Sequence, residues 1–438
     1  MKKYFYIPFL LLFSAGVTRA QNIEQVITKD YVSRIVKTLS SDEMQGRRTF
    51  SPGIDKAATF ISGEFKEIGL QPLQGETDYR QIFYKYQLLP LSIKVSIDGR
   101  PVVSSDLLVL GNTATAVNFN QSHSDGWTTL DTSKAFRPQL LEFLKSKKQQ
   151  LVLVDQKFAV DFKRMQISFA NRGLDEKDLK QSNSPATVFV LAKQSAVKKF
   201  DVALQYRVNK VALFNVAAMI PGKSKAKEVV IFSGHYDHIG ILKAEGQDSI
   251  ANGADDDASG TSAMIALAKY YKQANNNERT LIFVAFTAEE IGGYGAKYFS
   301  EQLNPDEVVA MFNIEMIGKE SKFGKNTGFI TGYERSDFGK ILQKNLAGTA
   351  FTFHPDPYPE EDLFYRSDNA TLAALGVPAH TISTDKIPTD KLYHSVKDEY
   401  SSIDADIIVA VTRAIAQSAG SIIKGIDTPV RIPKLATQ

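Results

Sequence analysis

The sequence contains no cysteine among its 438 residues. A chain without cysteine forms no disulfide bonds, offers no thiolate nucleophile and has no cysteine for lipid attachment. Hydrophobic residues make up 43% of the chain, which is ordinary for a globular protein of this length. The fold must therefore be held by its hydrophobic core and by any metal ion that it binds.

Basic blocks and long apolar runs are also missing. The net charge is +3, from 52 Lys and Arg against 49 Asp and Glu, and the two signs are mixed along the chain. This distribution does not favour a nucleic-acid-binding protein. Beyond the N-terminal segment, no apolar stretch approaches the length of a membrane span. We expect no nucleic-acid partner and no membrane span after signal removal, while the oligomeric state stays open.

The first twenty residues have the features of a signal peptide. Lys2 and Lys3 precede a short apolar run, and a small-residue cleavage site ends at Ala20. The apolar run is too short to span a bilayer comfortably. The sequence therefore predicts an exported protein, periplasmic or secreted, that loses residues 1–20. A retained N-terminal anchor is the alternative.

The remaining chain divides into three parts by its hydrophobic pattern. Residues 21–80 predict two helices, over 31–39 with Asp30 as the N-cap and over 54–68 with Gly69 as the stop. Residues 81–210 carry short apolar or alternating runs, which predict a β-rich inserted domain bordering the site, with a single helix over 136–147. Residues 211–438 alternate strands with helices.

This last alternation predicts the fold class. Strands are expected over 229–233, 280–286, 308–314 and 379–383, and helices over 260–271, 338–346 and 404–423. Strands that alternate with helices imply an α/β fold, with a mixed, mostly parallel central sheet and helices on both faces. The β-rich inserted domain is a separate part of the predicted fold.

Polar clusters recur where the predicted strands of the α/β part end. In open α/β sheets, sites form outside the carboxyl ends of the strands. Imidazole and carboxylate groups suit zinc, and five such ligands with one shared carboxylate suit a pair of metal ions. Two adjacent glutamates let one bind metal while the other accepts a proton. The clusters contain His235, Asp237, the acids at 255–257, Glu289, Glu290, Glu315 and His394.

Each cluster alone has an ordinary structural explanation. Three acids before a helix can cap it, two glutamates can interact with a helix dipole, and one histidine can be satisfied by hydrogen bonds. Their occurrence together, in order, at successive strand ends favours a metal site. The other histidines receive structural interpretations: a loop for His123, structural or rim positions for His238 and His354, and the core for His380.

The motifs resemble those of the M28 family of zinc aminopeptidases, which have a bacterial aminopeptidase-like (phosphorylase/hydrolase-like) fold. They are GHYDH at 234–238, GADDDASG at 253–260, AEEIG at 288–292, NIEMIG at 313–318 and YHSVKD at 393–398. The resemblance covers roughly residues 228–425. It extends to LSSDEMQGR at 39–47 and GLQP at 69–72, and so assigns the N-terminal helices to the peptidase domain. By position, the insertion is similar to a protease-associated domain that some relatives carry.

The resemblance implies two zinc ions per chain. It implies that His235 and Glu315 bind one ion, that Glu290 and His394 bind the other, and that Asp256 bridges both. The family usually has a cis peptide after the bridging residue, here between residues 256 and 257. Two positions depart from the pattern. Glu315 stands where the family commonly has Asp, and SDN at 367–369 stands where relatives often end in His.

The resemblance also implies catalytic roles and a reaction. Asp237 would orient His235, Glu289 would be the general base, and Tyr393 would help to stabilise the oxyanion. The implied reaction removes N-terminal residues from peptides by metal-activated water. Three alternatives stay open: a glutaminyl cyclase-like acyltransferase with one zinc, a carboxypeptidase or dipeptidase on the same scaffold, and a non-catalytic binding protein. The complete set of acidic residues argues against the last, and the preferred substrate side chain stays open.

Overall fold

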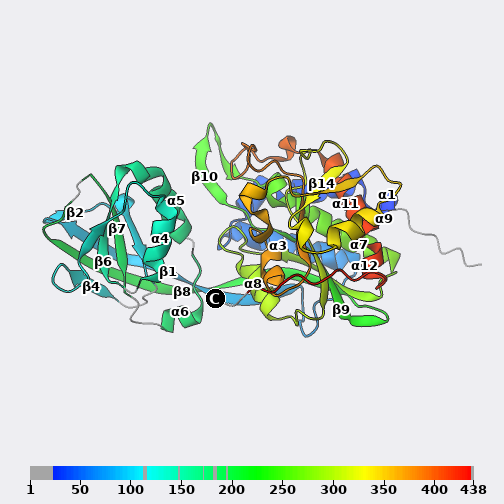
Figure 1. Ribbon diagram of the computed structural model, residues 1–438, viewed down its shortest axis with the longest axis horizontal. Helices are drawn as coiled ribbons and strands as arrows, with labels where there is room; N and C mark the ends of the chain where they lie inside the picture. The colour runs from blue at the N-terminus through cyan, green and yellow to red at the C-terminus, as the bar shows by residue number, and fades with distance from the viewer. Residues whose placement is uncertain are drawn as a thin grey trace, which may run out of the picture.

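A computed structural model describes residues 23–111, 116–146, 148–170, 172–180, 185–193 and 196–435 of the chain. The predicted signal peptide, residues 1–20, lies outside the described residues. Figure 1 shows two lobes side by side, joined by the strands β1 (Arg80–Ile97) and β8 (Phe200–Ile220), which pair with each other antiparallel. In the described parts of the chain, no helix is long and apolar enough to cross a membrane.

The large lobe is built on a mixed sheet. Among the described residues ten strands belong to it, in the order β15-β14-β16-β13-β9-β12-β8-β1-β2, with β4 paired to β8. The four adjacent strands β12, β9, β13 and β16 are parallel to one another. Strand β8 is antiparallel to β12, and β14 is antiparallel to β16. The remaining bounds are β2 Arg100–Pro101, β4 Val117–Asn120, β9 Lys225–His235, β12 Arg279–Phe286, β13 Val308–Ile314, β14 Thr327–Ile330, β15 Thr352–Pro355 and β16 Ala379–Ser383.

Helices cover both faces of this sheet, and the predicted α/β class is confirmed. One face packs against α2, α3, α7, α9, α11 and α12, and the other packs against α8 and α10. The predicted helix over 404–423 is two helices, α11 (Ala405–Ser418) and α12 (Gly420–Ile423). The others are α1 Ile23–Val26, α2 Lys29–Leu39, α3 Pro52–Ile68, α7 Gly260–Ala274, α8 Tyr294–Glu301, α9 Phe338–Asn345 and α10 Asn369–Ala374.

The central strands are apolar along their whole length because both of their faces are covered. Every residue of β12 and of β13 is buried. Phe232 of β9 stacks on Phe283 of β12 and on Phe312 of β13, with ring centroids 5.4 and 4.8 Å apart. Aromatic packing of this kind adds to the burial of apolar area. It holds together the three strands whose carboxyl ends carry the predicted site.

The small lobe contains more helix than its sequence pattern suggests. Its sheet has the order β3-β7-β6-β5, and β6 is parallel to both β5 and β7. One face packs against the far ends of β1 and β8, and the other packs against α4 and α5. The bounds are β3 Leu107–Leu110, β5 Trp127–Thr129, β6 Gln150–Asp155, β7 Thr187–Ala192, α4 Phe136–Lys145, α5 Ala159–Ala170 and α6 Glu176–Lys180.

The prediction of one helix in this region is therefore wrong. Helix α5 is amphipathic: Phe162 is buried, and Met165 and Phe169 pack beside it at helical spacing. Two further strands, β10 (Gly240–Glu245) and β11 (Asp248–Ala251), form a hairpin of the large lobe that projects on the side of the small lobe in Figure 1.

The N-terminal cap of α2 also differs from the prediction. Thr28 is the cap, and its hydroxyl oxygen accepts a hydrogen bond from the backbone N–H of Tyr31 at 3.2 Å. Asp30 lies inside the first turn of the helix. At the end of α3, Gly69 adopts the left-handed conformation with φ of 79°, as predicted.

We expect Thr28→Ala to lower the free energy of unfolding by about 1 kcal/mol, because it removes the oxygen that satisfies a free helix N–H. Asp30→Asn serves as the control. It should lower stability less, since Asp30 contributes only a charge near the helix N-terminus. Urea denaturation of both variants measures the difference, and equal losses would contradict the assignment of the cap.

Candidate metal centre

The predicted site residues follow the carboxyl ends of three neighbouring strands. Strand β9 ends at His235, Glu289 and Glu290 come shortly after β12, and Glu315 comes directly after β13. The turn Ala254–Ser259, which leads into α7, supplies Asp256. The sheet therefore brings together side chains that are up to eighty residues apart in the sequence.

Asp256 lies at the centre of this cluster. Its Oδ1 is 3.1 Å from Nε2 of His235, and its Oδ2 is 3.3 Å from Nε2 of His394. The peptide bond between Asp256 and Asp257 is cis, as predicted. The Asp256 side chain is only 3% exposed, so its charge depends on the groups around it. A carboxylate with one imidazole at each oxygen has the arrangement expected of a ligand shared by two metal ions.

Glu290 and His394 lie together on one side of Asp256. Oε2 of Glu290 is 2.9 Å from Nε2 of His394. The ring of Tyr393 stacks on the ring of His394, with centroids 3.9 Å apart. Both loop residues therefore face the cluster, as the motif at 393–398 predicts.

Two buried carboxylates behind the cluster hold its backbone. Asp237 accepts hydrogen bonds from the N–H groups of Glu289 and Glu290, at 3.1 and 3.4 Å, and from the hydroxyl of Thr49 at 3.1 Å. Nδ1 of His235 lies closer to the backbone carbonyl oxygen of Asp237, at 3.1 Å, than to its carboxylate, at 3.8 Å. Asp237 thus contacts His235 mainly through its backbone.

Asp257 ties the ends of β9 and β13 to the start of α7. It accepts hydrogen bonds from the N–H groups of His235, Gly260 and Met316, at 3.1, 3.0 and 3.1 Å. A carboxylate with several backbone donors is a structural support, so Asp257 fixes its neighbours' positions while Asp256 faces the histidines.

The environments of two acidic groups in the site differ in their effect on ionisation. Burial raises the pKa of Glu289 well above its usual range, and the charge of Glu315 adds to this effect. Burial also opposes ionisation of Asp256, but the nearby imidazoles, with His238 and His235 foremost, outweigh it and hold the pKa of Asp256 well below its usual range. Asp256 therefore suits a charged ligand, and Glu289 suits a group that takes up a proton.

The donor atoms fit zinc. Oε2 of Glu315 is buried and has no hydrogen-bond partner among the described residues. Nε2 of His235 is also buried, and the 3.1 Å approach of Oδ1 of Asp256 lacks the geometry of a hydrogen bond. Buried polar atoms without a partner are unusual, and a bound ion is one of the arrangements that satisfies them. Imidazole nitrogens and carboxylate oxygens in a buried cluster are a donor set that zinc accepts.

A cavity that is open to solvent adjoins the cluster. Asp256, Glu289, Glu315 and Tyr393 line it on the side of the cluster. Its apolar wall comes from Met316, Phe329, Leu363 and Ile387, and its other lining residues include Arg366, Ser367 and Asp385. The cavity therefore places the candidate general base beside a space that can hold a substrate side chain.

The unusual residue at the end of the SDN sequence has a structural role. The side-chain amide of Asn369 donates hydrogen bonds to the carbonyl oxygens of Phe364 and Ala379, at 2.9 and 3.2 Å. Asn369 is fully buried. It supports the start of α10 and the strand β16, whereas Ser367 lines the cavity.

His238 belongs to the cluster, although the sequence pattern placed it among structural or rim residues. It is 1% exposed, and its Nδ1 is 2.8 Å from Oε1 of Glu290 and 3.7 Å from Oδ2 of Asp256. The donor atoms of these three residues lie within 4.8 Å of one another. The available signal was its position three residues after His235, beyond the same strand end.

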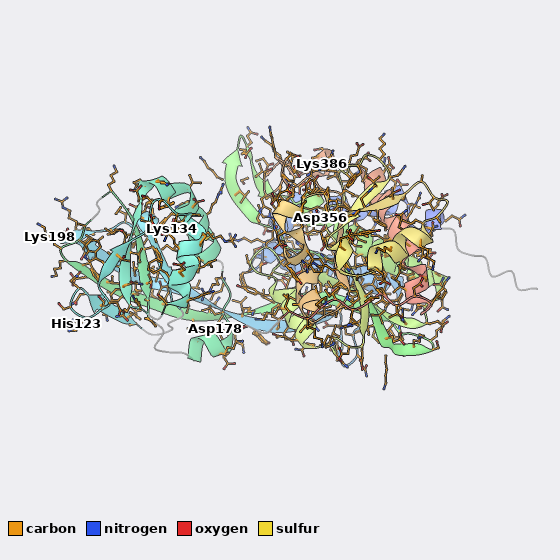
Figure 2. All side chains as sticks on the ribbon, in the orientation of Figure 1. His123, Lys134, Asp178, Lys198, Asp356 and Lys386 are labelled. Carbon is orange, nitrogen blue, oxygen red and sulfur yellow. The ribbon has the colours of Figure 1, made fainter. Side chains whose placement is uncertain are left out.

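The other histidines lie elsewhere. His380 is fully buried in β16, and its Nδ1 is 2.8 Å from the carbonyl oxygen of Thr331, which confirms it as a core residue. His354 stacks on Phe323, with ring centroids 4.0 Å apart. His123 lies at the far side of the small lobe in Figure 2 and does not join the cluster.

Comparison with known proteins identifies the family. The sequence model of Peptidase family M28 matches residues 215–419. The α/β part of this chain belongs to peptidase family M28. Leucine aminopeptidase 1 of Ajellomyces capsulatus is 27% identical to this chain over 209 residues, which cover 44% of the chain and 52% of that protein. Aminopeptidase YwaD of Bacillus subtilis is 30% identical over 101 residues, which cover 22% of the chain and 20% of that protein.

The matches thus span about half the length, or less, of these curated relatives. Solved structures extend the likeness of the fold. An aminopeptidase from Aneurinibacillus sp. strain AM-1 superposes with a TM-score of 0.58 at 17% identity, covering 95% of this chain and 98% of that one. BSAP, a zinc aminopeptidase from Bacillus subtilis, superposes with a TM-score of 0.55 at 13% identity, covering 92% and 97%. At these identities the structures show a shared fold.

Proposed function

We propose that this M28 protein is a zinc-dependent aminopeptidase that removes N-terminal residues from peptides. The observation that carries the proposal is the position of Asp256, between His235 and His394, next to a cavity lined by Glu289. The similarity to leucine aminopeptidase 1 and to a zinc aminopeptidase supports it. Export to the periplasm or the medium is part of the proposal and rests on residues 1–20 alone.

The donor set divides into two zinc positions that share Asp256. His235 and Glu315 would hold one ion, and Glu290 and His394 would hold the other. When bound, zinc would polarise the substrate carbonyl and increase the acidity of water. Glu315 carries one methylene more than the Asp common in the family, and its unpartnered Oε2 supports a ligand role for the longer side chain.

The protein's own groups would move the proton and hold the substrate. Glu289 would accept the proton of the attacking water and pass it to the leaving amine, and its raised pKa suits both steps. Burial raises the pKa of Tyr393, so that its hydroxyl stays protonated and can donate a hydrogen bond to the developing oxyanion. Phe329 and Leu363 of the cavity wall would contact the side chain of the N-terminal residue.

The polar groups around the cavity favour a free amino terminus over a free carboxyl terminus. Asp256, Glu289, Glu315 and Asp385 line the cavity, and the two carboxyl oxygens of Asp385 are buried without a hydrogen-bond partner in the described structure. Burial raises the pKa of Glu289 and raises the pKa of Asp385 to about 8, but a protonated carboxyl group still accepts hydrogen bonds from an ammonium group. Among the described lining residues the basic one is Arg366, and Glu361 already pairs with it at 3.0 Å, which leaves no unpaired basic side chain in that lining for a substrate carboxylate.

We expect the zinc-reconstituted protein to hydrolyse aminoacyl p-nitroanilides about 10²-fold or more faster than their N-acetylated counterparts, because acetylation removes the ammonium N–H donors that the carboxyl oxygens of the cavity accept. The measurement is the initial rate for each matched pair of substrates. Protein stripped by a chelator should lose this activity and should regain it when zinc is returned.

Each alternative enzyme class gives a different pattern in the same assay. Equal rates on free and acetylated substrates would contradict an aminopeptidase. Release of C-terminal residues would indicate a carboxypeptidase instead. Cyclisation of N-terminal glutamine without peptide hydrolysis, by a protein that holds one zinc, would indicate an acyltransferase of the glutaminyl cyclase kind.

A further inference from the structure

His238 is held rigidly beside the metal centre. Strand β9 continues into Tyr236, whose N–H donates to the carbonyl oxygen of Phe286 at 2.9 Å and whose hydroxyl donates to that of Phe214 at 2.7 Å. The backbone N–H of His238 donates to the carbonyl oxygen of Arg47 at 3.2 Å. These bonds fix the backbone on both sides of Asp237, so that His235 and His238 reach Asp256 from different sides.

The side chain of His238 contacts Glu290 rather than Asp256. Its Nδ1 is 2.8 Å from Oε1 of Glu290, against 3.7 Å from Oδ2 of Asp256. A carboxylate only accepts hydrogen bonds, so Nδ1 of His238 carries the proton and donates it. The other oxygen of Glu290, Oε2, faces His394 at 2.9 Å. Each oxygen of Glu290 therefore has its own imidazole.

The ring of His238 has no room to swing away from Glu290. It packs against the bare backbone of Gly253, where an added Cβ would lie 2.7 Å from Cγ and Cδ2 of the ring. Gly253 also has φ of +58°, which side-chain-bearing residues rarely adopt. The loop that carries Asp256 is thus shaped to keep the imidazole in this position.

The two ring nitrogens of His238 differ in their surroundings. Nε2 is buried and has no hydrogen-bond partner among the described residues. The shortest polar contact of the ring is the hydrogen bond from Nδ1 to Oε1 of Glu290, and this contact fixes how the ring and the carboxylate face each other.

We propose that His238 is a positioning residue for the second metal position. By donating Nδ1–H to Oε1 of Glu290, it leaves Oε2 on the side of His394, where Glu290, His394 and Asp256 would together hold the cation. Glu290 would then bind through one oxygen, and a coordination position would stay open for water or substrate. This inference rests on the proposed zinc-dependent function, and it goes beyond the ligand set assigned there.

Two substitutions separate the hydrogen bond from the rest of the side chain. In His238→Asn, the amide nitrogen occupies nearly the place of Nδ1 and can still donate to Glu290, but a neutral amide nitrogen does not bind zinc. In His238→Ala the donor is lost. We expect His238→Ala to weaken the second equivalent of zinc by about 10- to 100-fold, the usual effect of losing a partner of a metal ligand. His238→Asn should recover most of this affinity.

The measurement uses stripped protein, zinc alone and a chromophoric chelator as the competitor. Cobalt(II) absorption supplies a second readout, because a change in Glu290 from one-oxygen to two-oxygen binding raises the coordination number and lowers the band intensity in His238→Ala. His354→Asn is the matched control, since it makes the same exchange at a histidine outside the cluster, and it should bind both zinc equivalents like the wild type. If His238→Ala does not fold, His238→Gln replaces it, because its amide reaches the place of Nε2.

The outcomes are distinguishable. Unchanged zinc affinity and cobalt spectrum in His238→Ala would overturn the inference. So would equal weakening in His238→Asn and His238→Ala, which would make His238 a ligand. If the wild type itself binds no second zinc and cleaves no aminoacyl substrate, the proposed function fails, and the inference fails with it. Two zinc equivalents and activity in the wild type, with no effect in the variants, overturn only the inference.

Discussion

The variant Glu289→Gln should bind zinc like the wild type and lose about 10³-fold or more of its kcat. The side chain keeps its shape, but an amide cannot accept the proton of the attacking water, and general base catalysis is typically worth 10²- to 10⁴-fold. The contact that places this residue is unaffected, because its backbone N–H, and not its side chain, donates to Asp237 at 3.1 Å. Glu289 is the cavity-lining member of the adjacent glutamate pair.

The experiment compares kcat and zinc content in the same preparations. Glu301→Gln, which makes the same exchange on the exposed end of α8, is the matched control and should keep full turnover. Turnover in Glu289→Gln within tenfold of the wild type, at equal zinc content, would remove Glu289 as the base. Loss of zinc from this variant would make Glu289 a ligand, and Glu290 would then become the candidate base.

The positions of the candidate ligands could be predicted because they follow strands that are easy to recognise. Strands β12 and β13 are buried on both faces, so their sequences are continuous apolar runs that stop where polar side chains begin. The carboxyl ends of parallel strands meet at one edge of the sheet. Glu289, Glu290 and Glu315 could therefore be assigned to one site from the sequence alone.

The role of His238 could not be predicted in the same way. Its contact with Glu290 depends on the course of the chain after β9, which the backbone N–H groups of Tyr236 and His238 determine through bonds to Phe286 and Arg47. These partners are distant in the sequence, and no local pattern indicates them. The motif at 234–238 shows two histidines but not which of their nitrogens face the acidic side chains.

The small lobe was harder to predict from the sequence. Each of its helices and strands is a short local segment, but its strands pair with partners that are distant in the sequence. Strands β1 and β8 continue from the large sheet into the small lobe, and the break in register near Pro90 divides β1 into what resemble two short strands. The helical spacing of Phe162, Met165 and Phe169 was present in the sequence, but it lies among strand-like runs. A helical pattern that lies among strand-like patterns is easily mistaken for another strand.

Arg47 is a residue outside the candidate ligand set whose loss should affect the protein strongly. Its side chain is completely buried. In the described structure its guanidinium donates to backbone carbonyl oxygens at the end of α2, in the segment after β9 and in the loop that carries Asp256. The acceptors are Leu39 at 2.6 Å, Tyr236 at 2.9 Å, Asn252 at 2.5 Å, Gly253 at 2.9 Å and Asp256 at 3.4 Å.

We expect Arg47→Met to lower the free energy of unfolding by about 4 kcal/mol or more. Methionine fills much of the volume, but it leaves several buried carbonyl groups without a donor, and each such group costs about 1–3 kcal/mol. It also removes a buried positive charge that interacts favourably with Asp256 and Asp398. Arg47→Lys keeps the charge but has fewer donors in a different geometry. Its free energy of unfolding should therefore lie between those of the wild type and Arg47→Met.

Arg413→Met is the control for losing an arginine that donates to backbone carbonyls. Arg413 donates to Ile27 at 3.0 Å and to Glu24 at 3.3 Å, at a partly exposed position where water can replace it. Guanidinium chloride denaturation of the metal-free variants measures the difference in stability. Equal losses in Arg47→Met and Arg413→Met would contradict the assignment of Arg47 as the support of the site.

The loss of Arg47 should also reach the metal centre, because its acceptors flank the ligands. Tyr236 follows His235 directly, and the carbonyl oxygen of Asp256 belongs to the central ligand itself. Zinc that binds only the folded protein raises its stability in proportion to the logarithm of the zinc concentration over the dissociation constant. If Arg47 holds these two loops in register, saturating zinc should stabilise Arg47→Met less than the wild type. An equal stabilisation would mean that the loops keep their arrangement without the guanidinium, so that Arg47 supports the fold but not the metal site.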